Sequence, residues 1–353
     1  MSRSLPGVQE LSGFPAIVAS LRSISNFEVF FVRRRLLALT VVPLLLFGVA
    51  ACGDASGSDS ASKAAKGDTI AGVKVSGEFG TEPTVEVDEP LDVKETQSQV
   101  ITVGDGDEVE EGKQALLHLY LANGTTGEKA AATYDQGPPV TMTMSEGQLF
   151  PALLDSIVGQ PVGSRVAVAA LPKDAYGEAG EEKLKLGPDD NVVFVVDVMS
   201  VEPKEVLDGP DGEEPADAPT DIPTIEEKDG NVTNLTFENA PAKPSDELQV
   251  ITLIEGDGPP ARAASLVTFD YFGQIYGSEK IFDQSYDKEP VTFPLGTGGL
   301  IKGWDEGLVG VKQGSRVMVI APPDFGYGPK GNPQAGIKGT DSLAFVVDIL
   351  GVS

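Results

Sequence analysis

The chain has 353 residues, enough for two domains with tails and linkers, and its formal net charge is -28. An acidic surface of this kind repels nucleic acid, so we expect no nucleic-acid partner. With one Cys and one His in the sequence, a disulfide within the chain and a His-rich zinc site are excluded, and nucleophile–histidine catalysis lacks its residues.

The N-terminal segment has the pattern of an export signal. Arg33-Arg-Arg35 precedes an apolar run, Leu36–Val49, that is shorter than the about 20 residues of a membrane span. Val49-Ala-Ala-Cys52 resembles a bacterial lipoprotein signal. The resemblance implies a signal peptide over residues 1–52, lipidation at Cys52 and a place on the extracytoplasmic face of the cell membrane. An ordinary signal with a leftover Cys is the alternative.

Changes in composition divide the rest of the chain. Residues 53–72 are rich in Gly, Ser, Ala and Asp, which predicts a flexible tether. Residues 204–229 place four prolines among Asp and Glu, which predicts a stiff acidic linker without a core. We therefore expect one domain over residues 73–203 and a second over residues 230–353.

Three sequence motifs occur twice, about 150 residues apart. The paired motifs are Gln99-Val-Ile-Thr102 with Gln249-Val-Ile-Thr252, Gly163-Ser-Arg-Val166 with Gly314-Ser-Arg-Val317, and Phe194-Val-Val-Asp197 with Phe345-Val-Val-Asp348. Because solenoid repeats are far shorter, this period indicates a duplicated domain.

Apolar residues in the second repeat alternate mostly with a period of two. Val267, Phe269 and Tyr271 share one face of an expected strand. The only helical spacing joins Ile301, Trp304 and Leu308. The pattern predicts an α+β fold in which an antiparallel sheet curves around one short helix, with a pocket between them.

The second repeat resembles the FKBP-type, tacrolimus-binding peptidyl-prolyl cis-trans isomerases over nearly its whole length, and the first repeat is a degenerate copy. The resemblance implies two FKBP-like domains, isomerase activity without a cofactor, proline-containing polypeptide clients, and macrolide ligands such as tacrolimus. The site residues that it implies are Tyr271, Phe282, Asp283, Phe293, Leu300, Ile301, Trp304, Tyr327, Ile337 and Phe345.

The resemblance also implies a role for each part of this pocket. Trp304 would form its floor, and the Tyr327 hydroxyl and the Ile301 backbone N–H would hold substrate carbonyls. Asp283 would be tied to Tyr271 and would order the wall. Val291 stands where the family usually has an aromatic residue, and Asn332 stands where it often has His; both changes bear on substrate preference.

The first repeat is expected to fold but to have weak or no activity. Leu153 replaces Trp304, Met142 replaces Phe293, and Leu149-Phe150 stands for Leu300-Ile301. His118 is expected to be a packed or edge residue. The residues that the first repeat is taken to keep are Tyr120, Tyr134-Asp135, Tyr176-Gly177 and Phe194.

These observations predict an exported, lipid-anchored isomerase that assists the folding of exported proteins and acts through its C-terminal domain. Two other functions remain open at this point: a non-catalytic chaperone that binds peptides, and a surface-scaffold lipoprotein whose domains only bind a partner.

Overall fold

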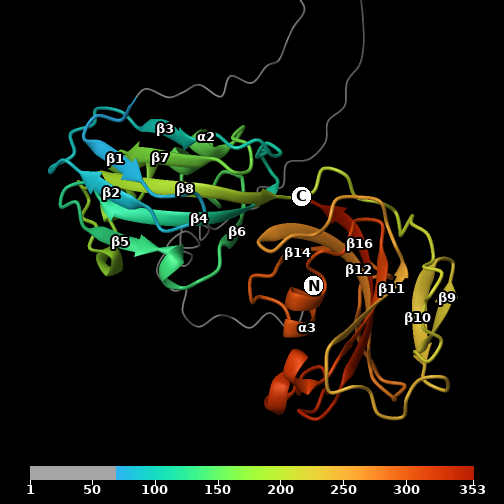
Figure 1. The fold of residues 1–353 in the computed structure, drawn as a ribbon. Helices are drawn as coiled ribbons and strands as arrows, with labels where there is room; N and C mark the ends of the chain where they lie inside the picture. Colours follow the sequence, from blue (N-terminus) through green and yellow to red (C-terminus); the bar gives the residue numbers. More distant parts are fainter. Residues whose placement is uncertain (1–68) are drawn as a thin grey trace, which may run out of the picture.

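The computed structural model describes residues 69–353, so the predicted signal peptide, Cys52 and most of the predicted tether lie outside the described range. The described chain forms two domains that lie side by side (Figure 1). Ile70 is 1% exposed and packs into the first domain, so the last residues of the predicted tether belong to folded structure. Within residues 69–353, no helix has the length and apolar character needed to cross a membrane.

The first domain combines a two-stranded hairpin, β1–β2, with a six-stranded antiparallel sheet. The sheet order is β3-β7-β8-β4-β5, and β6 also pairs with β4. Its elements are β1 (Val73–Ser76), β2 (Thr84–Val87), β3 (Gln97–Thr102), β4 (Gln114–Asn123), β5 (Lys129–Ala132), η2 (Thr133–Asp135), β6 (Val140–Thr143), α2 (Pro151–Ile157), β7 (Arg165–Ala170), η3 (Pro172–Asp174), η4 (Gly177–Ala179), η5 (Glu182–Leu184) and β8 (Val192–Val201).

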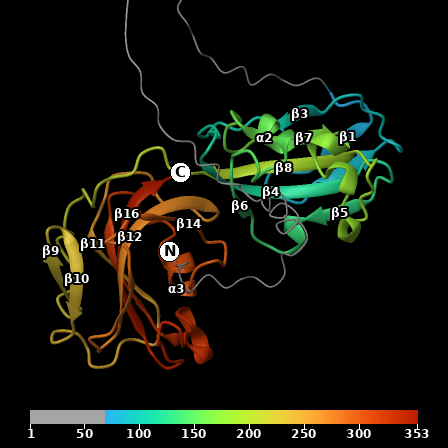
Figure 2. The same cartoon turned by 180° about the vertical axis from the view of Figure 1, so that it is seen from behind.

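The second domain repeats this arrangement with the sheet order β11-β15-β16-β12-β13, and β14 also pairs with β12. Its hairpin is β10–β9, and its short helix α3 lies inside the curve of the sheet (Figure 2). Its elements are β9 (Thr224–Lys228), β10 (Asn231–Thr236), β11 (Gln249–Ile254), β12 (Ser265–Ile275), β13 (Ile281–Gln284), β14 (Val291–Leu295), α3 (Lys302–Gly307), β15 (Arg316–Ala321), η6 (Pro323–Phe325), η7 (Gly328–Lys330) and β16 (Leu343–Val352). Antiparallel sheets with one short helix each confirm the expected architecture.

Alternation along the strands separates two apolar clusters in the second domain. Phe269 and Tyr271 of β12 join the cluster around the helix, whereas Phe272 of the same strand joins a separate outer cluster with residues of the β9–β10 hairpin. Because successive side chains of a strand point to opposite faces, one strand serves both clusters. The inner cluster holds the candidate site.

The outer face of the first sheet is closed by a buried ion pair. Arg165 is 0% exposed, and it donates to both carboxylate oxygens of Asp197 at 2.6 and 2.7 Å. Its remaining N–H groups donate to the backbone carbonyls of Gly77 and Thr81, between β1 and β2. Tyr134 donates its hydroxyl to Asp197 at 2.7 Å. The hairpin therefore supplies the hydrogen bonds that a buried guanidinium needs.

The second domain repeats this network. Arg316 donates to both oxygens of Asp348 at 2.6 and 2.8 Å, and Tyr286 donates its hydroxyl to the same carboxylate at 2.8 Å. Glu227 of β9 forms an ion pair with Arg316. The side chain of Gln274 also joins β12 to both backbone groups of Leu235 in β10. The hairpin is thus bound to the second sheet by polar contacts as well as by apolar packing.

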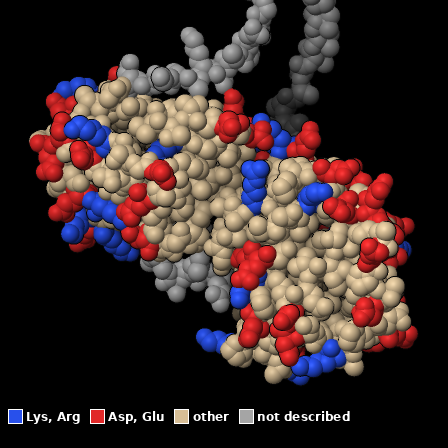
Figure 3. Space-filling view, viewed as in Figure 1, with Lys and Arg blue, Asp and Glu red and all other residues tan. Residues whose placement is uncertain are grey.

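The segment predicted as a linker, residues 204–229, is in contact with the second domain. Leu207 donates its backbone N–H to Leu350 at 2.9 Å, and Glu213 and Glu255 exchange two backbone hydrogen bonds. Strand β9 lies inside the predicted linker, so the expected boundary at residue 230 cuts the β9–β10 hairpin. Acidic composition did not prevent packing, because the backbone makes these contacts while the Asp and Glu side chains of the segment remain exposed. Figure 3 shows acidic side chains spread over the surface of the molecule.

The two domains also touch directly. The backbone N–H of Leu266 donates to Oγ of Ser200 at 2.7 Å, which joins β12 to the end of β8. The hydroxyl of Ser353 lies 2.5 Å from the same oxygen and donates to the Leu266 carbonyl at 3.3 Å. Ser200 is 1% exposed, so this junction is closed to solvent.

We expect Asp348→Asn to lower the free energy of unfolding of the second domain by about 3 kcal/mol, because Arg316 would lose its buried counter-charge and keep only its ion pair with the more exposed Glu227. Denaturant titration followed by Trp304 fluorescence measures this loss. Glu306→Gln is the control, since Glu306 forms an exposed pair with Lys302 at 3.6 Å and should change stability by less than about 0.5 kcal/mol. Equal effects of the two substitutions would contradict the role given to the buried pair.

Candidate functional site

The site residues predicted for the second domain come together on the inner face of its sheet. We call them the aromatic cluster. Trp304 lies at its centre with its indole 4% exposed, and its ring lies 5.3 Å from that of Tyr271 and 5.6 Å from that of Phe345. The cluster members are Tyr271 from β12, Phe282 and Asp283 from β13, Phe293 from β14, Leu300 and Ile301 before α3, Trp304 from α3, Tyr327 before η7, Ile337 before β16 and Phe345 from β16.

One side of the aromatic cluster remains open to solvent. Phe282, Phe293, Leu300, Ile301 and Tyr327 are only partly buried, although all pack against the inner core. An open hollow of about 380 Å³ adjoins the cluster at Leu300 alone, since its other lining residues are Gly296, Gly298, Lys302, Asp305 and Glu306. An apolar surface that is held by a core and left half-open is suited to binding an apolar ligand.

The hydroxyl of Tyr271 is fixed by Asp283. It donates to Oδ2 of Asp283 at 2.6 Å, which is the contact expected from the sequence. Burial and this carboxylate raise the pKa of Tyr271, so its hydroxyl keeps its proton. The backbone N–H of Tyr271 donates to Oγ of Ser285 at 2.8 Å. These bonds hold the wall of the cluster in one geometry.

Gly273 makes room for the wall residue Phe282. A Cβ atom at Gly273 would lie 2.8 Å from the ring of Phe282, closer than such atoms approach in proteins. The ring of Phe282 packs edge-on against Phe345 at 5.4 Å. Gly273 pairs with Asp283 in the β12–β13 ladder. Its lack of a side chain leaves the space in which the ring of Phe282 packs within the cluster.

Two N–H groups of the cluster have no acceptor among residues 69–353. The indole Nε1 of Trp304 is buried without a hydrogen-bond partner. The backbone N–H of Ile301, at the start of α3, donates no hydrogen bond to another described residue. Burial raises the pKa of the Tyr327 hydroxyl, and the side chain of Asn332 beside it acts in the other direction. The N–H of Ile301 belongs to a partly exposed residue and is a donor that a ligand carbonyl could accept from, whereas the indole N–H is enclosed by the protein.

The first domain does not contain the tyrosine that was expected at the position of Tyr271. Leu119 pairs with Val196 as Tyr271 pairs with Val347, so Leu119 is the equivalent residue. Tyr120 is one residue further on and joins the outer cluster. The expectation for Tyr120 was wrong, because a shift of one residue moves a side chain to the other face of a strand.

Tyr134 and Asp135 are likewise not the equivalents of Phe282 and Asp283. Tyr134 binds Asp197 on the outer face as Tyr286 binds Asp348. The residues of β5 that occupy the positions of Phe282 and Asp283 in the register are Ala130 and Ala131. The first domain therefore lacks counterparts of the wall residues Tyr271 and Phe282, and it also lacks a counterpart of Trp304.

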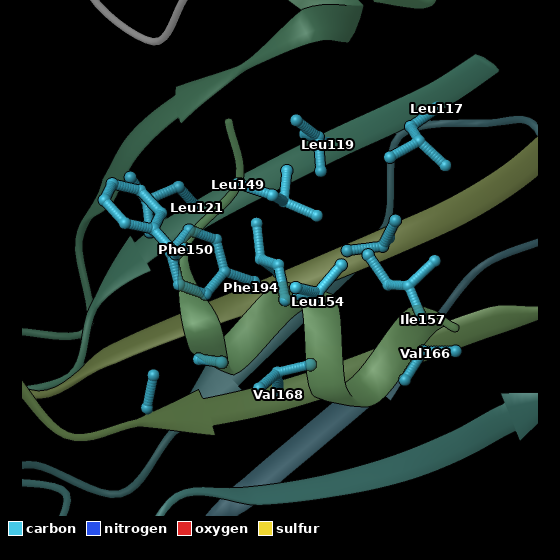
Figure 4. Close-up of a cluster of buried hydrophobic side chains, with 14 of the residues drawn as sticks. Leu117, Leu119, Leu121, Leu149, Phe150, Leu154, Ile157, Val166, Val168 and Phe194 are labelled. Atoms are coloured by element: carbon cyan, nitrogen blue, oxygen red, sulfur yellow. The ribbon is translucent and has the colours of Figure 1, made fainter. Parts of the chain in front are cut away.

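The space at the centre of the first domain is filled by its own side chains. Phe150 stands where the second domain has Ile301 and is 2% exposed (Figure 4). Its ring lies 4.7 Å from Tyr176 and 6.0 Å from Phe194. Leu153, at the position of Trp304, is 1% exposed. The two domains thus share a fold but differ in whether the centre is open.

His118 is a packed residue of β4, as expected. It is 7% exposed, its Nδ1 lies 2.8 Å from Oγ1 of Thr133, and its ring stacks on Tyr134 at 4.2 Å. Burial lowers the pKa of His118, which favours the neutral ring. It lies on the outer face, away from the centre of the domain.

Comparison with known proteins identifies both domains. The model of the FKBP-type peptidyl-prolyl cis-trans isomerase family matches residues 105–199 and 258–350, more than half of the chain. An FK506-binding protein of Streptomyces anulatus is 36% identical over 111 residues, which are 31% of this chain and 90% of that protein.

Two Aspergillus proteins show the same similarity over different shares of their length. FK506-binding protein 1A of Aspergillus fumigatus is 39% identical over 93 residues, 26% of this chain and 81% of that protein. FK506-binding protein 4 of Aspergillus oryzae is 40% identical over 95 residues, 27% of this chain but only 20% of that protein.

The centre of the first domain is filled and that of the second is partly open, so shortening a side chain at the two centres should change the free energy of unfolding by different amounts. We expect Phe150→Ala to lower the free energy of unfolding of the first domain by about 3 kcal/mol, because it empties a closed core. Ile301→Ala should cost about 1 kcal/mol or less in the second domain, because that side chain is half-exposed. Denaturant unfolding of each variant measures the difference. A loss for Ile301→Ala as large as that for Phe150→Ala would show that the second centre is closed as well.

Proposed function

The chain belongs to the FKBP-type peptidyl-prolyl cis-trans isomerase family, and we propose that the isomerase activity lies in the aromatic cluster of its second domain. The observation that carries this proposal is the contrast between the domains. The second has Trp304 beneath a half-open apolar surface, while the first has Phe150 and Leu153 in the corresponding space.

The reaction suits a site without a nucleophile or a general base. An X–Pro bond isomerises slowly because rotation breaks amide resonance, and no covalent bond needs to form or break to speed it. The twisted amide has lost conjugation and is solvated less strongly at its carbonyl than the planar form. A dry apolar surface that binds the twisted form better than the planar form therefore accelerates rotation, and each roughly 1.4 kcal/mol of preference gives a tenfold gain in rate.

Each part of the aromatic cluster has a task in this mechanism. The prolyl ring would lie against the indole of Trp304, with the contacting rings of Phe282 and Phe345 forming a wall beside it. The N–H of Ile301 and the hydroxyl of Tyr327 would hold carbonyl groups of the substrate. Asp283 would keep Tyr271 oriented and would not accept a substrate proton, because no proton transfer is involved. A macrolide such as tacrolimus would bind the same surface and inhibit the enzyme.

We expect Trp304→Leu, which gives the second domain the residue of the first, to lower kcat/KM for a prolyl peptide at least tenfold in the full chain. A protease-coupled isomerase assay with and without tacrolimus measures it. Phe150→Ile in the first domain is the matched control and should leave kcat/KM unchanged. The proposal fails if Trp304→Leu keeps full activity, or if the activity of the intact chain is insensitive to removal of the indole and to tacrolimus.

The pattern around Cys52 supports a further proposal about where the enzyme acts: we propose an extracytoplasmic isomerase, anchored by a lipid on Cys52, whose clients are exported proteins. Cys52→Ala should abolish the incorporation of labelled palmitate and release the protein from the membrane fraction of a bacterial host. Full membrane retention of the variant without label would show that Cys52 is not the anchor.

A further inference from the structure

The loop formed by residues 332–337 is part of the wall of the aromatic cluster. Its ends are joined by two backbone hydrogen bonds, from Asn332 to Ile337 and from Ile337 to Asn332, both at 2.9 Å. Ile337 is 3% exposed and packs into the inner core, where Ala335 also lies against it. Asn332 lies beside the hydroxyl of Tyr327 and lowers its pKa. A displacement of this loop would therefore move Ile337 and change the surroundings of Tyr327.

An exposed side chain joins this loop to the segment between β12 and β13. Nζ of Lys280, just before β13, donates to the backbone carbonyl of Gly336 at 2.8 Å. Gly336 has a φ of +67°, and a Cβ atom there would lie 1.9 Å from the Lys280 ammonium. The ammonium thus sits in the space left by the missing side chain. The bond spans from the β12–β13 hairpin to the loop.

The first domain holds the corresponding carbonyl by a different residue. Its loop closes through two hydrogen bonds between Glu181 and Leu186, so Lys185 takes the place of Gly336. The Lys185 carbonyl accepts a hydrogen bond from Nδ2 of Asn123 at 3.1 Å, at the end of β4. Asn123 is 5% exposed and also binds Asp190. Both domains therefore restrain the same carbonyl, with side chains from different positions.

The hydrogen bond to the Lys185 carbonyl and the hydrogen bond to the Gly336 carbonyl differ in how easily they can break. In the first domain, whose centre is filled, the donor is a buried amide fixed by a second bond. In the second domain, whose centre is half-open, the donor is an ammonium at the end of an exposed, flexible side chain. Water can replace the Gly336 carbonyl as its acceptor, so this contact can break without leaving a buried group unpaired.

We propose that Lys280 is a positioning residue that latches loop 332–337 against the aromatic cluster and so controls how long a prolyl ligand stays bound. The effect on ligands depends on the function proposed above, but the latch itself does not. When the contact between Lys280 and Gly336 breaks, the loop that carries Asn332 and Ile337 is released on one side, and the ligand loses a wall. Closing the contact completes the surface.

The latch is tested in the full chain with Lys280→Met, which keeps the stem of the side chain and removes the donor. Hydrogen exchange in the peptide covering residues 332–337 should become roughly fivefold faster, which is the size of effect expected when one hydrogen bond is lost. Dissociation of tacrolimus, followed by Trp304 fluorescence, should accelerate by a similar factor. KM for a prolyl peptide should rise while kcat changes by less than about twofold. Lys280→Arg, which keeps a donor, should restore both rates.

Lys288→Met is the matched control, because Nζ of Lys288 also donates to a backbone carbonyl, that of Gln284, at 3.0 Å, but outside the loop. It should leave exchange and dissociation unchanged. Unchanged exchange in Lys280→Met overturns the latch. Faster hydrogen exchange in Lys280→Met with an unaltered dissociation rate of tacrolimus overturns the claim that the latch controls how long the ligand stays bound. Should the wild-type chain neither bind tacrolimus nor isomerise peptides, the proposed function fails, and the exchange data still decide the latch.

Discussion

The alternation of side chains across the central strands is the constraint on which both domains depend. In β12, Tyr271 faces the helix and the neighbouring Phe272 faces the hairpin. In β16, Phe345 belongs to the inner cluster and Asp348 binds Arg316 on the outer side. A single register between these two strands therefore places the aromatic cluster on one face and the buried ion pair on the other.

The outer face explains why each domain begins with a hairpin. Arg165 and Arg316 are buried between sheet and hairpin, and a buried guanidinium must have its charge and donors satisfied. The hairpins supply backbone carbonyls in the first domain and Glu227 in the second. A folding unit therefore starts with the hairpin, ahead of the segments that match the family, residues 105–199 and 258–350.

Much of the second domain could be predicted from its sequence, because its aromatic residues follow a known order and its strands alternate clearly. The fold and the gathering of the ten residues follow from that order, while their individual roles stay predictions. The first domain was harder, since Tyr120 and Tyr134 have the expected residue type in the wrong register. The offset from Phe194-Val-Val-Asp197 to its copy is 151 residues, which aligns Tyr120 with Tyr271, whereas the strand pairing places Leu119 there at an offset of 152.

Contacts between segments that are distant in the sequence could not be predicted, because they have no local sequence pattern. The bond from Lys280 to Gly336 joins two loops, and an exposed lysine near a glycine is common in any sequence. The packing of residues 204–229 was missed for a related reason. Its composition is typical of a linker, but its backbone hydrogen bonds to Leu350 and Glu255 depend on the folded partner, which composition cannot show.

The central claim is that duplication left one binding surface open and filled the other with Phe150. The stoichiometry of tacrolimus binding to the full chain, measured by isothermal titration calorimetry, tests this claim most directly. The account predicts one molecule bound per chain. Two molecules per chain, or one that remains bound after the indole of Trp304 is removed, would contradict it.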